Sequence, residues 1–297
     1  MKYSGILNKS NIKKLHGYKV SRETVHGNVD IDEELLVEKD SWYLLQDQSL
    51  NFFKHRQDAR LFGECLSQKV FEEVGFETVK YEIIYLDDIL GLITPNFQDL
   101  HKYNYYDLIN ISMLLSSFPR GYGGFTYKDV LENISYLNLP NSNEVIQELI
   151  DRYVGEWVTH QIDGNPRNII FSVDKETKEI KVGPSFDRES CFGIDNTGYF
   201  NSESLNIWVP SIPYEDLDFR KNPYTIDGAD ANITALFIDY PDQTLKAFER
   251  VFSVDYDTLF KDYKSGRLSF SLSDDTIGYL SRVIDNKYEN KEKILSL

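Results

Sequence analysis

Short apolar and aromatic runs, separated by polar turns, dominate the first hundred residues of the chain. Three of the runs cover only four or five residues each: Glu34–Val37, Trp42–Leu45 and Leu50–Lys54. Two more, Val79–Leu86 and Ile89–Thr94, flank Asp87-Asp88, a pattern that is typical of a β-hairpin. Residues 1–30 are polar and predict either a strand pair or a loosely held arm. This part of the chain is therefore expected to form a small antiparallel sheet.

One helical pattern interrupts these strands. Asp58 is placed to cap a helix over Ala59–Val74, and Gly75 follows as a stop signal. Apolar side chains recur at helical spacing on two sides of this helix, so we expect it to lie between two layers of the protein. The two stripes run through Phe62, Cys65, Leu66 and Val70, and through Leu61 and Phe71.

Beyond Phe97 the pattern changes to helices. The helical period is strongest over Asn143–Thr159, and Pro241 must kink or divide a later helix. Residues 193–230 are rich in Asn, Pro, Gly and Asp and predict surface loops. The other expected helices are Tyr105–Ser116, Lys128–Tyr136, Ile233–Phe252, Asp255–Tyr263 and Asp274–Tyr288. A β-rich part followed by an α-rich part predicts an α+β fold with two lobes, a β-rich N-lobe over 1–97 and a mainly helical C-lobe over 98–297.

Composition and charge exclude several classes of protein. A formal net charge of −16 argues against direct nucleic-acid binding, which depends on Lys and Arg neutralising phosphates. No stretch approaches the ~20 apolar residues that a membrane helix needs, and the N-terminus lacks the apolar segment of a secretory signal. Two cysteines, Cys65 and Cys191, cannot form a disulfide framework. We therefore expect a cytoplasmic protein without a membrane partner.

A second hairpin, over residues 169–182, brings polar residues together. With its turn in the polar stretch between the two strands, Val173 lies opposite Ile180. Continuing the ladder toward the open end places Asn168 opposite about Ser185. Asp187 then lies at the same open end, next to the loop that holds Asp163. Amide and carboxylate oxygens are ligands that Mg²⁺ prefers. The sequence therefore predicts a magnesium site formed by Asn168 and Asp187.

Asp163 is the candidate catalytic carboxylate. It lies five residues before Asn168, across a Gly-Asn-Pro turn, and can face the same site without binding the metal. Such a carboxylate can orient a substrate hydroxyl and accept its proton. The order Asp-x4-Asn followed by a later Asp is the catalytic-loop and metal-site pattern of protein kinases. Locally the segment could equally be a simple turn, but its place between a long helix and the hairpin favours a functional role.

Lys54 and Glu64 form a second candidate pair. Lys54 ends a predicted strand, and Glu64 lies between Leu61 and Phe71 on a helix expected to be largely buried. A buried carboxylate requires a cationic partner, so we expect the two side chains to meet. The alternative is an ordinary surface lysine and a solvated glutamate.

At these residues the sequence resembles the HipA-like serine/threonine kinases of bacteria, in particular small stand-alone members. Leu50–Glu64 is similar to their N-lobe motif, Ile93–Phe97 to the segment leading into the inter-lobe hinge, and Gly183–Asp187 to their metal-binding segment. The resemblance implies a protein-kinase-like fold, ATP and Mg²⁺ as cofactors, a protein substrate, and an antitoxin or other regulatory partner. It also implies that Lys54 contacts the ATP phosphates and that Glu64 positions Lys54. The nucleotide-binding residues implied by the hinge segment are Ile93, Thr94, Asn96 and Phe97.

One departure from the family pattern leaves alternatives open. The family usually carries Arg-His directly after the catalytic Asp, whereas this chain has Gly164-Asn165. No Gly-x-Gly-x-x-Gly precedes Lys54 either; family members commonly lack this signature, so its absence leaves only the phosphate-cradling loop unassigned. The glycine-rich segment 120–124 follows the hinge and is interpreted as a turn. Besides a protein kinase, the sequence is therefore compatible with a kinase-fold enzyme that acts on a small molecule or transfers AMP. It is also compatible with a pseudokinase that acts as a binding module.

Overall fold

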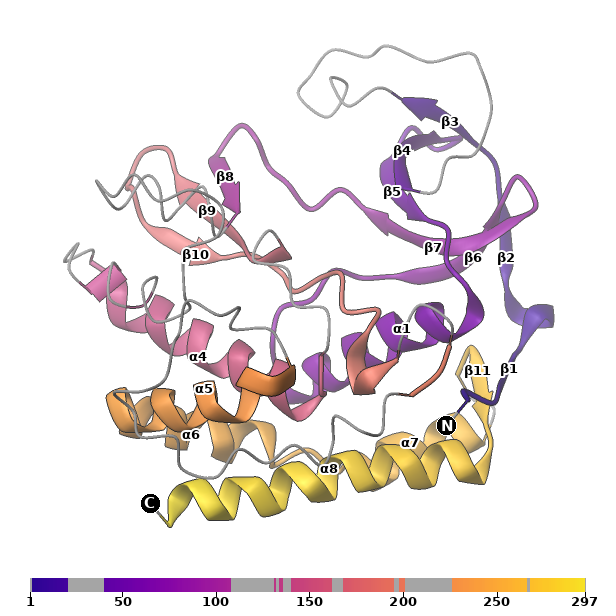
Figure 1. Ribbon diagram of the computed structural model, residues 1–297. Helices are drawn as coiled ribbons and strands as arrows, with labels where there is room; N and C mark the ends of the chain where they lie inside the picture. The colour runs from indigo at the N-terminus through magenta and orange to yellow at the C-terminus, as the bar shows by residue number, and fades with distance from the viewer. Residues whose placement is uncertain are drawn as a thin grey trace.

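The computed structural model describes residues 2–20, 40–107, 131, 134–135, 140–161, 168–194, 198–200, 226–265 and 268–296. A curled sheet lies at one end of the molecule and a group of helices at the other, with helix α1 between them (Figure 1). Among the helices in these ranges, none is long and apolar enough to cross a membrane.

The larger sheet has six strands. They are β2 (Lys13–Leu15), β3 (Gly17–Val20), β4 (Asp40–Leu45), β5 (Leu50–Lys54), β6 (Glu82–Leu86) and β7 (Ile89–Pro95). Their order is β2-β6-β7-β5-β4-β3, and all neighbours are antiparallel except β2 and β6. The two edge strands follow each other in the chain with only His16 between them, so the sheet must curl. The strands predicted over 42–45 and 50–54 are confirmed, and the one over 34–37 lies outside the described residues.

The β6–β7 hairpin confirms the predicted turn at Asp87-Asp88. Both residues have positive φ angles, 46° and 67°, as a two-residue hairpin turn of this kind requires. The first strand begins at Glu82 instead of Val79. The reason is that the Val79 N–H donates to the carbonyl of Ser185 at 2.9 Å, so this stretch joins the segment before Asp187.

Helix α1 (Asp58–Val74) lies where the sequence predicts it and ends at Gly75, which adopts a φ of 86°. The N-cap residue is Gln57, not Asp58 as the sequence suggested. Asp58 lies in the first helical turn, where its carboxylate still favours the helix N-terminus. Both apolar stripes contribute buried side chains, and α1 packs between the sheet and the C-terminal helices (Figure 1). The expected position between two layers is confirmed.

The second half of the chain is mainly helical. Its helices are α4 (Ser142–Val158), α5 (Ile226–Asp239), α6 (Pro241–Val251), α7 (Tyr256–Lys264) and α8 (Asp274–Leu295). Pro241 begins α6 and so divides the predicted helix. Of the helix predicted over 128–136, the described residues 131, 134 and 135 are helical. The expectation of surface loops over 193–230 is wrong in part, because Ile194 and Phe200 are buried and α5 already begins at Ile226.

A three-stranded sheet lies beside α4. It consists of β8 (Tyr103–Asp107), β9 (Ile170–Asp174) and β10 (Ile180–Val182), in the order β10-β9-β8. Val173 pairs with Ile180, which confirms the predicted register of the second hairpin. The helix expected from Tyr105 is wrong for its first three residues, because they pair with β9 as a strand. Its remainder, 108–116, lies outside the described residues.

The N-terminal segment joins the two ends of the molecule. Strand β1 (Gly5–Leu7) pairs with β11 (Phe270–Leu272), just before α8, and Tyr3 stacks on Phe62 of α1 with ring centroids 5.2 Å apart. The chain then continues into β2 and β3 of the six-stranded sheet. The lobe boundary at residue 97 stays a prediction. Strand β1 belongs to the predicted N-lobe by sequence, but it packs with the second half of the chain.

Candidate active site

A cavity of about 380 Å³ lies between the six-stranded sheet and the β9–β10 hairpin. Its wall combines residues from strands β4, β5 and β7 with residues from β9 and the segment after β10. The apolar and aromatic part includes Trp42, Phe52, Val79, Tyr81, Ile170 and Phe186. The charged lining residues in the described part of the chain are Asp40, Lys54, Arg56 and Asp187. The cavity therefore has an apolar wall and a charged end.

Lys54 is the centre of the charged end. Its side chain is 4 % exposed, and its Nζ lies 3.2 Å from Glu64 Oε2 and 3.5 Å from Glu189 Oε2. Nζ also donates a short hydrogen bond to Asp187 Oδ1, and it lies 5.7 Å from the centroid of the Tyr81 ring. The predicted contact between Lys54 and Glu64 is present, and two further carboxylates surround the same ammonium.

The charges of this cluster depend on one another. Burial lowers the pKa of Lys54, but attraction to the carboxylates, Glu64 first, outweighs it and holds that pKa well above its ordinary value. Burial also raises the pKa of Glu64, which Lys54 opposes only in part. For Asp187, burial is outweighed by Lys54 and by the hydrogen bond from Asn168, so its pKa lies below the ordinary value. At neutral pH Lys54 is therefore cationic and Asp187 is anionic.

Asn168 and Asp187 meet at the open end of the second hairpin. The Nδ2 of Asn168 donates to Asp187 Oδ2 at 2.8 Å. The ladder continues one step beyond β10, through the Gly183 N–H and the Ile170 carbonyl at 2.6 Å, and this continuation brings the two side chains together. Asp187 has a φ of 59°, a left-handed conformation that is uncommon outside Gly, Asn and Asp and is often found at functional sites.

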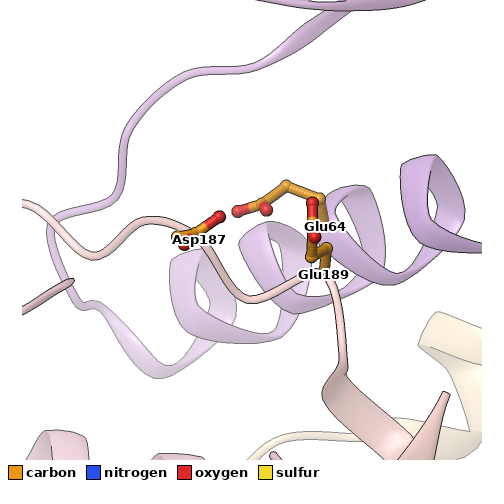
Figure 2. A group of neighbouring side chains, drawn as sticks. All are labelled: Glu64, Asp187 and Glu189. Carbon is orange, nitrogen blue, oxygen red and sulfur yellow. The ribbon is translucent and has the colours of Figure 1, made fainter. Parts of the chain in front are cut away.

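The oxygen atoms around Asp187 fit a divalent cation. Carboxylate oxygens of Glu64, Asp187 and Glu189 lie within 4.8 Å of one another, and Figure 2 shows Glu64 on α1 reaching toward Asp187. Asn168 lies beside Asp187, with its Nδ2 on Oδ2, and its amide carries a further oxygen that could bind a cation. Hard cations such as Mg²⁺ prefer oxygen ligands of these types. Lys54 contacts all three carboxylates, so its contacts do not distinguish them. Asp187 is the most accessible of the three and is therefore the best placed to bind a metal ion, together with Asn168.

Helix α1 is held tightly against the segment that carries Asp187. The Arg188 N–H donates to Glu64 Oε1 at 3.1 Å, and the Cys191 thiol donates to the Gly63 carbonyl at 2.9 Å. A Cβ atom at Gly63 would lie only 2.4 Å from the Glu189 carbonyl oxygen, so this close approach requires glycine. The position of Glu64 relative to Lys54 thus depends on backbone packing as well as on charge.

Gly63→Ala should therefore destabilise the protein. The added methyl group must push α1 away from Glu189, and overpacking of this kind costs about 1–3 kcal/mol of unfolding free energy. Gly278→Ala in α8 is the matched control, because its nearest neighbouring atom, Arg282 Nη1, would lie 3.7 Å from the new Cβ. That substitution should be neutral or stabilise by about 0.5–1 kcal/mol. Urea unfolding measures both, and equal effects at the two sites would contradict the packing argument.

The structure brings most, but not all, of the predicted site residues together. Thr94 and Phe97 line the cavity. Ile93 does not, because its side chain is buried in a separate cluster on the opposite face of the sheet, with Phe53. Asn96 is absent from the wall as well; its N–H donates to the Leu50 carbonyl at 3.0 Å. Asp163 lies outside the described residues.

Several residues of the site were missed by reasoning from the sequence. Phe52 lies two positions before Lys54 on β5, so strand alternation could have placed both on the cavity face. The same alternation predicts that Ile93 and Thr94 face opposite sides. Arg56, two positions after Lys54, continues the same spacing and also lines the cavity. Glu189 had no such local signal, because its role in the cluster arises from contacts between distant segments.

No family model and no curated protein sequence matches this chain. Among solved structures, it is similar to the proinflammatory kinase CtkA of Helicobacter pylori, with a TM-score of 0.61 and 15 % identity over 87 % of this chain and 95 % of that chain. It is also similar to HipA of Shewanella oneidensis, from a complex of the toxin–antitoxin proteins HipA and HipB with operator DNA. That match has a TM-score of 0.51 and 11 % identity over 95 % of this chain and 72 % of HipA. These likenesses confirm the expected α+β, kinase-like fold.

Proposed function

We propose that this chain is an ATP- and Mg²⁺-dependent phosphotransferase of the HipA-like kind, which phosphorylates a serine or threonine hydroxyl of a protein. The observation that carries the proposal is the convergence of Lys54, Glu64, Asn168 and Asp187 at one cavity. A paired lysine and two oxygen ligands beside an apolar pocket are what ATP and its metal ion need. The kinase-like fold of CtkA and HipA supports the same proposal.

The cavity suits a nucleotide in size and in polarity. Its volume, about 380 Å³, lies in the range of small-molecule sites. The apolar wall, with Phe52 and Ile170, would hold the adenine ring. Thr94 and Phe97 lie where β7 leaves the sheet and would border the base. Lys54, positioned by Glu64, would contact the phosphates at the charged end.

Asn168 and Asp187 would hold Mg²⁺, which neutralises phosphate charge when it is bound. In the proposed reaction, the acceptor hydroxyl oxygen forms a bond to the γ-phosphorus. The bond from that phosphorus to the β–γ bridging oxygen breaks, and ADP leaves with the electron pair. We assign Asp163 to orient the hydroxyl and accept its proton. Lys54 stabilises the charge on the phosphates throughout the transfer.

The proposed setting is the cytoplasm, and the proposed partners are a protein substrate and an antitoxin or other regulatory protein. The HipA of similar fold belongs to a toxin–antitoxin system and was solved together with HipB. Both cysteines of this chain are free thiols, which is compatible with a reducing compartment.

The test uses ATP labelled at either the α- or the γ-phosphate, with Mg²⁺ and a panel of proteins that includes the chain itself. We expect the γ-label on a Ser or Thr residue, and no transfer when the metal is chelated. Label on a small molecule only, or the α-label on protein, would replace the proposal with a small-molecule kinase or an AMP transferase. Absence of transfer, together with no change in melting temperature on adding ATP and Mg²⁺, would favour a pseudokinase.

A further inference from the structure

We propose that Arg56 is a second phosphate-binding cation of the nucleotide site, and that Asp40 competes with the phosphates for it. This inference rests on the proposed function and deepens it. The chain has no Gly-x-Gly-x-x-Gly segment before Lys54, so the sequence pattern names no group besides Lys54 that would bind the phosphates. The inference assigns this role to Arg56.

Arg56 follows β5, two residues after Lys54, and its guanidinium lies between two carboxylates. Nε donates to Glu189 Oε2 at 2.5 Å. The outer nitrogens form a fork on Asp40, Nη1 to Oδ1 at 2.5 Å and Nη2 to Oδ2 at 2.9 Å. Nη1 also donates to the His55 carbonyl at 2.9 Å.

The two carboxylates are held very differently. The Glu189 side chain is 9 % exposed and also binds Arg60, so it is a fixed anchor for the Nε side of Arg56. The Asp40 side chain is 37 % exposed and lies at the first residue of β4. The Arg56 side chain is only 9 % exposed, so water competes mainly for the Asp40 carboxylate, and that end of the ion pair is the one that can be released. The inner contact thus orients the guanidinium, and the outer contact can be exchanged.

A phosphate group is the natural competitor for the outer contact. It offers two oxygens to the same guanidinium fork as a carboxylate does, and it carries more charge. Arg56 and Asp40 both line the cavity, together with Lys54 and Asp187. In the described wall the two positive and two negative charges cancel. A polyphosphate therefore meets an excess of positive charge only when Asp40 releases Arg56 and moves away. Asp40 would swing toward solvent while Nε stays on Glu189.

Calorimetric titration of the full chain with ATP, ADP and adenosine tests this inference. Arg56→Gln should weaken ATP binding by about tenfold, the effect of losing one charged hydrogen-bonding group, and leave adenosine binding unchanged. The variant should still fold, because Glu189 keeps Arg60 and Lys54 as cationic neighbours. Asp40→Asn should strengthen ATP binding by severalfold, and only when Arg56 is present.

Asp88→Asn is the matched control for Asp40→Asn. It removes the same charge from an exposed ion pair, with Lys14, at a turn outside the cavity wall. It should leave ATP binding unchanged. Equal loss of ATP and adenosine binding in Arg56→Gln, or an Asp40→Asn variant that binds ATP no better than the wild type, would overturn the inference while the proposed function stands. If the wild-type protein binds neither ATP nor adenosine, the inference and the proposed function are both contradicted.

Discussion

Replacing Asp187 with asparagine should lower phosphate transfer by at least about a thousandfold while the protein stays folded. The substitution keeps the shape of the side chain but removes the charge that would hold Mg²⁺. Asparagine also tolerates the left-handed backbone at this position, where φ is 59°. Lys54 retains Glu64 and Glu189 as partners, so the buried ammonium is not left unpaired.

Asp174→Asn is the matched control for this prediction. Asp174 lies at the far end of the same hairpin, where its carboxylate accepts the N–H groups of Glu176 and Thr177. Asparagine can form the same turn, so transfer should be unchanged. Transfer of γ-label and circular dichroism are measured on both variants. Substantial activity in Asp187→Asn, at any Mg²⁺ concentration, would refute the metal site at Asn168 and Asp187.

Lys54→Met should abolish transfer and also destabilise the protein by about 3–5 kcal/mol near pH 7. Methionine fills a similar volume, but Glu64, Asp187 and Glu189 lose the cation that they share. Three buried or half-buried carboxylates with oxygens within 4.8 Å of one another then repel. Urea unfolding gives the loss of stability, and the γ-label assay gives the loss of activity.

The stability difference between wild type and Lys54→Met should shrink as the pH falls from about 7 to about 5. Burial already raises the pKa of Glu64 above its ordinary value of 4.5, and Lys54 is the main influence that opposes this shift. Without Lys54, the folded protein takes up protons at a higher pH than the unfolded chain does. Its stability therefore recovers as the pH drops through that window. Asp187 behaves oppositely in the wild type, because its pKa is depressed and its stabilising effect is lost only at lower pH.

Two companion variants separate the loss of charge balance from the loss of a lysine as such. Lys80→Met removes an exposed lysine that lies 2.7 Å from Glu72 and is 67 % exposed, so it should cost less than about 1 kcal/mol. Lys54→Met combined with Glu64→Gln should regain part of the lost stability, because one uncompensated charge is removed. It should regain no transfer. If the double variant is no more stable than Lys54→Met, repulsion between the carboxylates is not the cause.

The sequence pattern correctly predicted those helices and turns whose conformation depends mainly on neighbouring residues in the chain. The two stripes of α1, the period of α4 and the Asp87-Asp88 turn all appear in the structure as expected. Strand β8 was mistaken for the start of a helix, because its partner, β9, lies more than sixty residues later in the chain. The early start of α5 has a similar cause: the apolar residues Ile233 and Leu236 pack into the core and support a helix that extends back into polar sequence.

The residues of the candidate site likewise fall into those that the sequence predicts and those that depend on contacts between distant segments. Asn168 and Asp187 were placed by counting along a hairpin, and their contact follows from its register. Lys54 and Glu64 could be paired because a buried carboxylate needs a cation. The contacts of Glu189 with Arg56 and Arg60 could not be predicted, because they depend on how the segment after Asp187 docks on α1. No spacing rule links those segments.

The pairing of β1 with β11 sets the order in which a newly synthesised chain can complete itself. Gly5 finds its partner only after Leu272 has left the ribosome. Until then Tyr3, which stacks on Phe62 of α1, is held by its own N–H on the Gly198 carbonyl and by the neighbouring Lys2–Tyr199 bridge. Closing so long a loop is slow, and it comes late. A chain that lacks β11 would thus keep the residues around Lys54 but lose the β1–β11 pairing that helps to hold Tyr3 against α1.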